Sequence, residues 1–111
     1  MNVGRALTYK GYTAPVSFEA EGGYLYGTVL GIRDKIYFEG ENAQEIVSSF
    51  HEAVDDYIAF CVEKGKDPEK PFKGTFNVRI GANLHERAAL KAAEKDESLN
   101  RFVAEAIAAA V

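Results

Sequence analysis

Three polar side chains alternate with three apolar ones over residues 75–80, and the polar types suit hydrogen bonding to nucleic-acid bases. They are Thr75, Asn77 and Arg79. Arginine can donate two hydrogen bonds to guanine, asparagine can form two with adenine, and threonine adds a hydroxyl and a methyl group. Strict alternation is the period of a half-buried β-strand, so these three side chains would share one face. The pattern predicts base-contacting positions at Thr75, Asn77 and Arg79.

The other face of this predicted strand is apolar and consists of Phe76, Val78 and Ile80. A lone strand leaves backbone groups unpaired along both edges, and nothing else in residues 75–111 is expected to pair with it. A second copy of the strand, antiparallel about a two-fold axis, would supply a strand for pairing and would cover the apolar face. The three apolar residues are therefore predicted to form a dimer core between four helices, while the two-stranded ribbon fits a DNA major groove.

Two helices are expected after this strand. The first is predicted over Leu84–Lys95 with Asn83 as its cap, and Ser98 should cap the second. Free amides and the positive end of the helix dipole at the start of the second helix suit a phosphate group. The residues predicted to contact DNA phosphates are Lys73, Ser98, Leu99 and Asn100.

The first half of the chain predicts an antiparallel sheet covered by one helix. Short aromatic and β-branched stretches, with a Gly22-Gly23 turn, indicate a three-stranded meander. Asn42 and Glu45 resemble a capping box for a helix that runs to about Lys64. The expected fold class is α+β: a domain over residues 1–64, a Pro/Gly-containing linker over 65–74, and a second domain over 75–111.

The formal net charge of −4 is divided unevenly. Residues 1–64 hold five Lys/Arg against ten Asp/Glu, whereas residues 65–111 hold eight against seven. Between Lys70 and Lys91 there are five basic residues and one acid, Glu86. An acidic first half suits a basic protein partner, and a basic segment suits phosphate.

Other chemistry-bearing residues are assigned structural roles. Cys61 is a lone cysteine, and His51 and His85 are too far apart for a short metal motif, so neither a metal site nor a cofactor is expected. Asp55 and Asp56 are adjacent on a helix and point in different directions. No apolar stretch is long enough to span a bilayer and residues 1–5 lead into no signal-peptide core, so a cytoplasmic protein is expected. The acidic residues of the predicted strands, Glu19, Glu21 and Glu39, lie at strand ends and do not form the converging set that a metal-dependent nuclease needs, so no enzymatic activity is expected.

The sequences TFNVRI and SLNRFVAEAI, separated by a helix and a short turn, resemble ribbon-helix-helix repressors. Two positions depart from that pattern: Gly81 stands where proline often follows the strand, and Asp96-Glu97 lacks the usual glycine. Over about residues 8–110 the chain resembles the HicB antitoxin family. The segments that carry this resemblance are Tyr12–Phe18, Gly27–Gly31, Phe38-Glu39-Gly40 and Ala53–Cys61.

The resemblance implies an N-terminal domain with a reduced RNase H-like fold that binds and blocks a HicA-like, mRNA-cleaving toxin. It also implies a homodimeric C-terminal domain that binds operator DNA and represses the pair's own operon. The sequence leaves open whether dimers pair into tetramers. Two alternatives stay open: a stand-alone regulator whose N-terminal domain senses a ligand, and a divergent nuclease.

Overall fold

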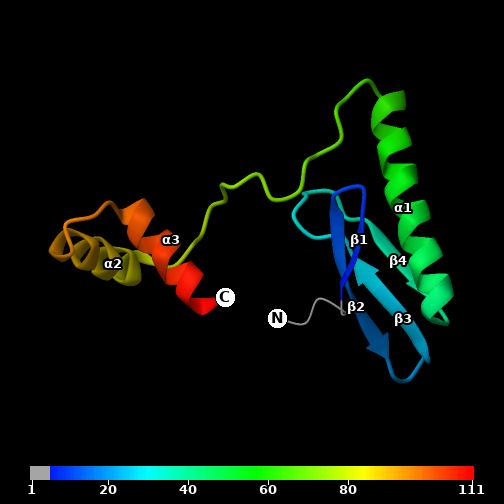
Figure 1. The fold of residues 1–111 in the computed structure, drawn as a ribbon, viewed down its shortest axis with the longest axis horizontal. Helices are drawn as coiled ribbons and strands as arrows, with labels where there is room; N and C mark the ends of the chain where they lie inside the picture. Colours follow the sequence, from blue (N-terminus) through cyan, green and yellow to red (C-terminus); the bar gives the residue numbers. More distant parts are fainter. Residues whose placement is uncertain (1–5) are drawn as a thin grey trace. The chain divides into compact units, whose positions relative to one another are not determined.

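The protein, seen in a computed structural model that describes residues 6–111, divides into two compact units. Unit 1 spans Met1–Thr75 and unit 2 spans Phe76–Val111. Residues 1–5, on which the expectation about export partly rests, lie outside the described residues. The elements of unit 1 are β1 (Ala6–Tyr9), β2 (Tyr12–Glu19), β3 (Tyr24–Thr28), β4 (Tyr37–Gly40) and α1 (Ala43–Glu63), and those of unit 2 are α2 (Ala82–Glu94) and α3 (Leu99–Ala110) (Figure 1).

The sheet of unit 1 has four antiparallel strands in the order β1-β2-β3-β4, so the prediction of three strands is wrong. The extra strand arises at Lys10-Gly11, where both residues have positive φ angles, 51° and 84°. Two consecutive positive φ angles build the tight hairpin turn that matches the twist of the flanking strands. The turn joins β1 to β2, which pair antiparallel from Tyr9 and Tyr12 onward.

Helix α1 packs against one face of this sheet (Figure 1). Its buried residues recur every three or four positions, which is the spacing of one face of a helix, and they are Ile46, Phe50, Val54, Tyr57 and Cys61. The sheet contributes alternate residues from each strand, including Ala14 and Phe38. A Cβ atom at Gly27 would lie only 2.6 Å from Cζ of Phe38, so glycine there lets the phenyl ring lie on the backbone.

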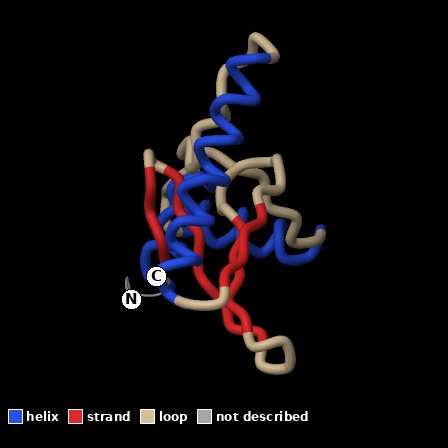
Figure 2. Tube along the Cα trace, turned by 90° about the vertical axis from the view of Figure 1, so that its right-hand side faces the viewer, coloured by secondary structure: helices blue, strands red, loops and turns tan. Residues whose placement is uncertain are grey.

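Strands β2 and β3 coil around each other toward their connecting turn (Figure 2). Helix α1 begins as predicted, since Asn42 Oδ1 accepts a hydrogen bond from the Glu45 amide at 2.8 Å. The second half of the expected capping box differs in detail. The Glu45 carboxylate reaches the amide of Glu41, one residue before the cap, at 3.0 Å.

In unit 2 the cap of α2 is Gly81, and the prediction of Asn83 is wrong. The carbonyl of Gly81 accepts the first helical hydrogen bond, from His85, which places Asn83 inside the helix. Gly81 has a φ angle of 85°, which the proline found in similar sequences cannot adopt.

The turn between α2 and α3 forms without glycine. Asp96 takes the left-handed conformation, with a φ angle of 55°, and the Glu97 amide donates back to the Ala92 carbonyl. This is the Schellman geometry, in which aspartate here replaces the usual glycine. Ser98 caps α3 as predicted, because its hydroxyl oxygen accepts from the Arg101 amide at 3.1 Å.

None of the described helices is both long and apolar enough to cross a membrane.

Replacing Phe50 by alanine tests the core. Its ring is fully buried between the sheet and α1, so the free energy of unfolding should fall by about 3–5 kcal/mol. Phe60→Ala is the matched control on the same helix, because the Phe60 side chain is half exposed and should matter much less. Urea titrations followed by circular dichroism measure both; equal losses would show that the packing described is wrong.

Candidate functional site

The predicted base-contacting residues lie in an exposed, non-helical segment, residues 75–80, called the arm below. The arm forms no β-ladder with any described residue, so its strand conformation stays a prediction that requires a second chain. Thr75, Asn77 and Arg79 are exposed, and Arg79 forms no ion pair within residues 6–111. The Arg79 guanidinium, which suits guanine best, is therefore not held by an ion pair within the described chain.

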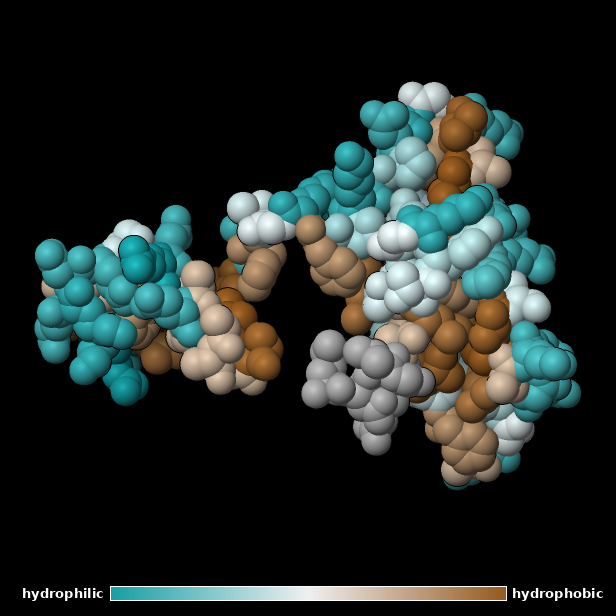
Figure 3. Space-filling view, viewed as in Figure 1, coloured by the Kyte–Doolittle hydropathy of each residue, from teal (hydrophilic) through white to brown (hydrophobic). Residues whose placement is uncertain are grey.

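The apolar side chains of the arm are exposed as well. Phe76 is 74% accessible, Val78 58% and Ile80 42%. Unit 2 is described throughout, and Ala92 is its one buried hydrophobic residue. The helices add further exposed apolar residues, namely Leu84, Leu90, Val103 and Ile107. Apolar surface on unit 2 is visible in brown in Figure 3. One copy of unit 2 therefore has apolar faces but almost no core.

Three of the four predicted phosphate contacts, Ser98, Leu99 and Asn100, lie together at the start of α3. The Ser98 cap occupies the amide of Arg101 and leaves the two preceding amides for a ligand. The Arg101 guanidinium is held within the chain, 3.8 Å from Glu97 and 3.5 Å from Glu105. Lys73 belongs to unit 1, so the fold of unit 2 does not bring it to this cluster.

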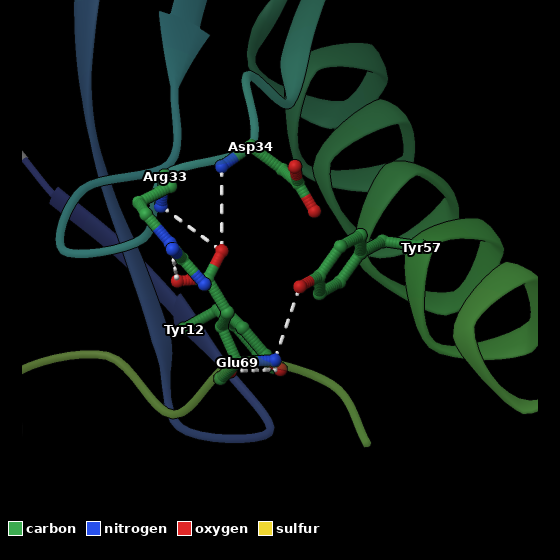
Figure 4. Close-up of polar contacts among 5 residues, drawn as sticks. All are labelled: Tyr12, Arg33, Asp34, Tyr57 and Glu69. Carbon is green, nitrogen blue, oxygen red and sulfur yellow. Dashed lines mark hydrogen bonds and ion pairs between the residues drawn. The ribbon is translucent and has the colours of Figure 1, made fainter. Parts of the chain in front are cut away.

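The chain that leads to the arm is fastened to unit 1 by residues 68–72, called the strap below. Glu69 makes the contacts shown in Figure 4. Its carbonyl accepts from the Tyr12 hydroxyl at 2.8 Å, and its amide donates to the Tyr57 hydroxyl at 3.0 Å. Its carboxylate accepts from the amides of Arg33 and Asp34 and from the Arg33 side chain. Part of the predicted linker, residues 65–74, is thus bound to the surface of unit 1 through Glu69.

The protonation states of Tyr12 and Glu69 favour these contacts. Burial raises the pKa of Tyr57 to about 12 and also raises that of Tyr12, so both hydroxyls keep their protons. Burial opposes ionisation of Glu69 as well, but the hydrogen bonds from Arg33 and Asp34 outweigh it and hold the carboxyl pKa below its ordinary value.

A second exposed region is the sheet face opposite α1. Register pairs put Tyr24, Tyr26 and Tyr37 on this face together with Glu19 and Glu39, and this set is called the tyrosine face below. The ring centroids of Tyr24 and Tyr26 are 6.1 Å apart, and those of Tyr26 and Tyr37 are 6.3 Å apart. Beside it, between β4 and α1, runs an open groove that includes Glu39, Glu52 and Asp56.

Two residues that were assigned structural roles from the sequence, His51 and Asp55, contact side chains of unit 1. His51 stacks on Tyr9 with a centroid distance of 4.0 Å. Asp55 binds Lys10 at 2.8 Å, and Lys10 lowers its pKa, whereas Asp56 lines the groove. No group of three or more His, Cys, Asp or Glu residues in the described part of the chain could hold a metal ion.

Sequence reasoning missed Glu69 and the groove. Glu69 stands in a segment without periodicity, and its partners lie 12 to 57 residues away in the chain. No local pattern marks such contacts. Glu52 and Asp56 are four residues apart and so share a helix face, which is a detectable signal, but their alignment with Glu39 depends on the packing of α1 against β4.

A protein-family model described as the HicB family matches residues 57–107. The match covers slightly less than half of the chain, from the last turns of α1 to α3, and it supports HicB-family membership. It does not extend to the β-sheet, where much of the resemblance noted in the sequence lies. No curated protein and no solved structure gives a significant match.

The strap should respond to acid. A depressed carboxyl pKa contributes stability above the unfolded-state value, near 4.5, and this contribution is lost as the pH falls through the lower folded-state value. The amide NMR signals of Arg33 and Asp34, which donate to Glu69 Oε2, should therefore shift together with a midpoint below 4.5. In Glu69→Gln this shared transition should disappear. A midpoint at or above 4.5, or a transition that persists in the variant, would exclude the contact.

Proposed function

We propose that this chain is the antitoxin of a toxin–antitoxin pair, in which unit 2 dimerises as a ribbon-helix-helix module and represses its own operon. Unit 1 binds and neutralises a HicA-like, RNA-cleaving toxin. The family match over residues 57–107 supports the antitoxin role in general. We propose toxin binding by unit 1 and operon repression by unit 2 in addition.

The proposal that unit 2 binds DNA rests on the exposed, unpaired arm. It presents apolar side chains on alternate residues, and unit 2 offers no strand that could pair with it. Two arms paired antiparallel would bury Phe76, Val78 and Ile80. They would turn Thr75, Asn77 and Arg79 outward from both copies. That ribbon presents six polar side chains in fixed positions to the major groove.

Phosphate contacts would orient the ribbon. The free amides at the start of α3 suit a phosphate oxygen, and two-fold symmetry places one such helix start on each side of the paired arms. These contacts carry no sequence information, which leaves discrimination to the arm. Operators read in this way are expected to have two-fold character.

The observation that favours a basic protein partner for unit 1 is its charge. Residues 1–64 carry twice as many acidic as basic residues, which repels nucleic acid and attracts a protein that binds RNA. Occlusion of the toxin's RNA-binding surface would be enough for neutralisation, and no catalytic group is needed.

Arg79→Ala tests the base-reading role. On DNA from upstream of its own gene the variant should lose about 1–3 kcal/mol of binding free energy, and it should lose much less on a duplex of shuffled sequence. Arg79→Lys is the control, because it keeps the charge but loses the two-pronged hydrogen bonding, and it should discriminate as poorly as the alanine variant. Fluorescence anisotropy at fixed salt measures all three. If Arg79→Ala lost the same binding free energy on both duplexes, Arg79 would contact phosphate and not a base. If its affinity were unchanged, Arg79 would lie outside the interface.

A further inference from the structure

No helix among residues 6–75 covers the tyrosine face. Helix α1 occupies the opposite side of the sheet, so Tyr24, Tyr26 and Tyr37 form an aromatic row on the free side. Tyr37 is about half exposed. Tyrosine offers a large contact area at a small loss of side-chain entropy, which explains its enrichment in protein interfaces. A row of three on one rigid sheet is thus a prepared contact surface.

The face continues around a free sheet edge. Strand β4 is the last strand in the order, so one of its edges pairs with no strand among residues 6–111. The groove beside this edge adds Glu52 and Asp56 to Glu39, and none of the three carboxylates forms an ion pair with a described residue. Glu39 accepts a hydrogen bond from the Tyr37 hydroxyl at 2.7 Å, which joins the aromatic row to the acidic groove.

Charge decides which occupant fits this surface. DNA, RNA and anionic membranes are repelled by uncompensated carboxylates, and a second copy would bring the same negative charges face to face. A protein surface with exposed arginines is complementary in two ways, because guanidinium groups stack on tyrosine rings and pair with carboxylates. Tyr37 itself remains neutral, since its hydrogen bond to Glu39 raises its pKa to about 12.

We propose that the tyrosine face and the adjoining β4–α1 groove are the docking surface for the basic protein partner, which lays arginine side chains across Tyr26 and Tyr37 and into the carboxylates Glu39, Glu52 and Asp56. This inference rests on the proposed antitoxin function and names the surface that performs it.

The test uses the full-length chain and the small basic protein encoded by the reading frame beside its gene. Calorimetry measures the affinity for that protein. Glu52→Lys should weaken binding about tenfold or more, because it places a like charge against the partner. Glu63→Lys is the matched control on the same helix, at an exposed position outside the groove, and should bind within about twofold of the unaltered chain. Tyr37→Ala should weaken binding similarly, whereas Tyr37→Phe should retain most of it.

The outcomes separate the surface from the function. Absence of such a protein, or no binding by the unaltered chain, contradicts the antitoxin function and this inference with it. Binding that Glu52→Lys and Glu63→Lys weaken equally leaves the function standing and overturns the surface. If Tyr37→Ala instead lowers the oligomeric state of the chain alone, the face pairs two copies and the proposal is wrong. Circular dichroism confirms that each variant is folded.

Discussion

A polypeptide segment with unpaired backbone groups and apolar side chains on alternate residues is a template for pairing, and while it stays exposed to water it forgoes the stabilisation that burial of those side chains would give. Residues 75–80 are in that situation, and the rest of unit 2 does not relieve it, because its two helices bury a single alanine well and leave most of their leucine, isoleucine and valine side chains accessible. A segment of 36 residues is also below the size at which one hydrophobic core usually suffices. The stability of unit 2 therefore has to come from another molecule, and symmetric association supplies a strand and a core in the same step.

Unit 1 solves the same problem within one chain. The buried face of α1 covers its sheet, and its strands pair in sequence order. The strap is held on unit 1 by the hydrogen bonds of Glu69 with Tyr12 and Tyr57. The strap also shortens the free connection to unit 2. Of the ten linker residues expected from sequence, those up to Phe72 follow the surface of unit 1, where the Phe72 ring lies against Gly31.

The extent to which sequence predicts this structure depends on the range of each interaction. The stripe of α1, the Asn42 and Ser98 caps and the bounds of α2 and α3 to within two residues follow from local patterns. The additional strand does not follow from the sequence because lysine rarely adopts the positive φ angle that the Lys10-Gly11 turn requires. The start of α2 is mispredicted because the polar side chain of Asn83 indicates a cap, whereas the structure uses the backbone of Gly81. The roles of Glu69 and of the acidic groove could not be predicted, since they depend on residues brought together by packing across the chain. The arm is the opposite case: its alternation is visible in the sequence, whereas its partner lies outside a single chain.

Hydrogen exchange of the backbone amides of residues 75–80 tests the account most directly, when it is measured on the full chain by NMR over a range of protein concentrations. Antiparallel pairing of two arms predicts that amides on the paired edge exchange slowly, that those on the free edge exchange fast, and that the protection falls on dilution as dimers dissociate. Uniformly rapid exchange at all concentrations in a chain whose α2 and α3 amides are protected would contradict it, because unit 2 would then be folded without a paired arm.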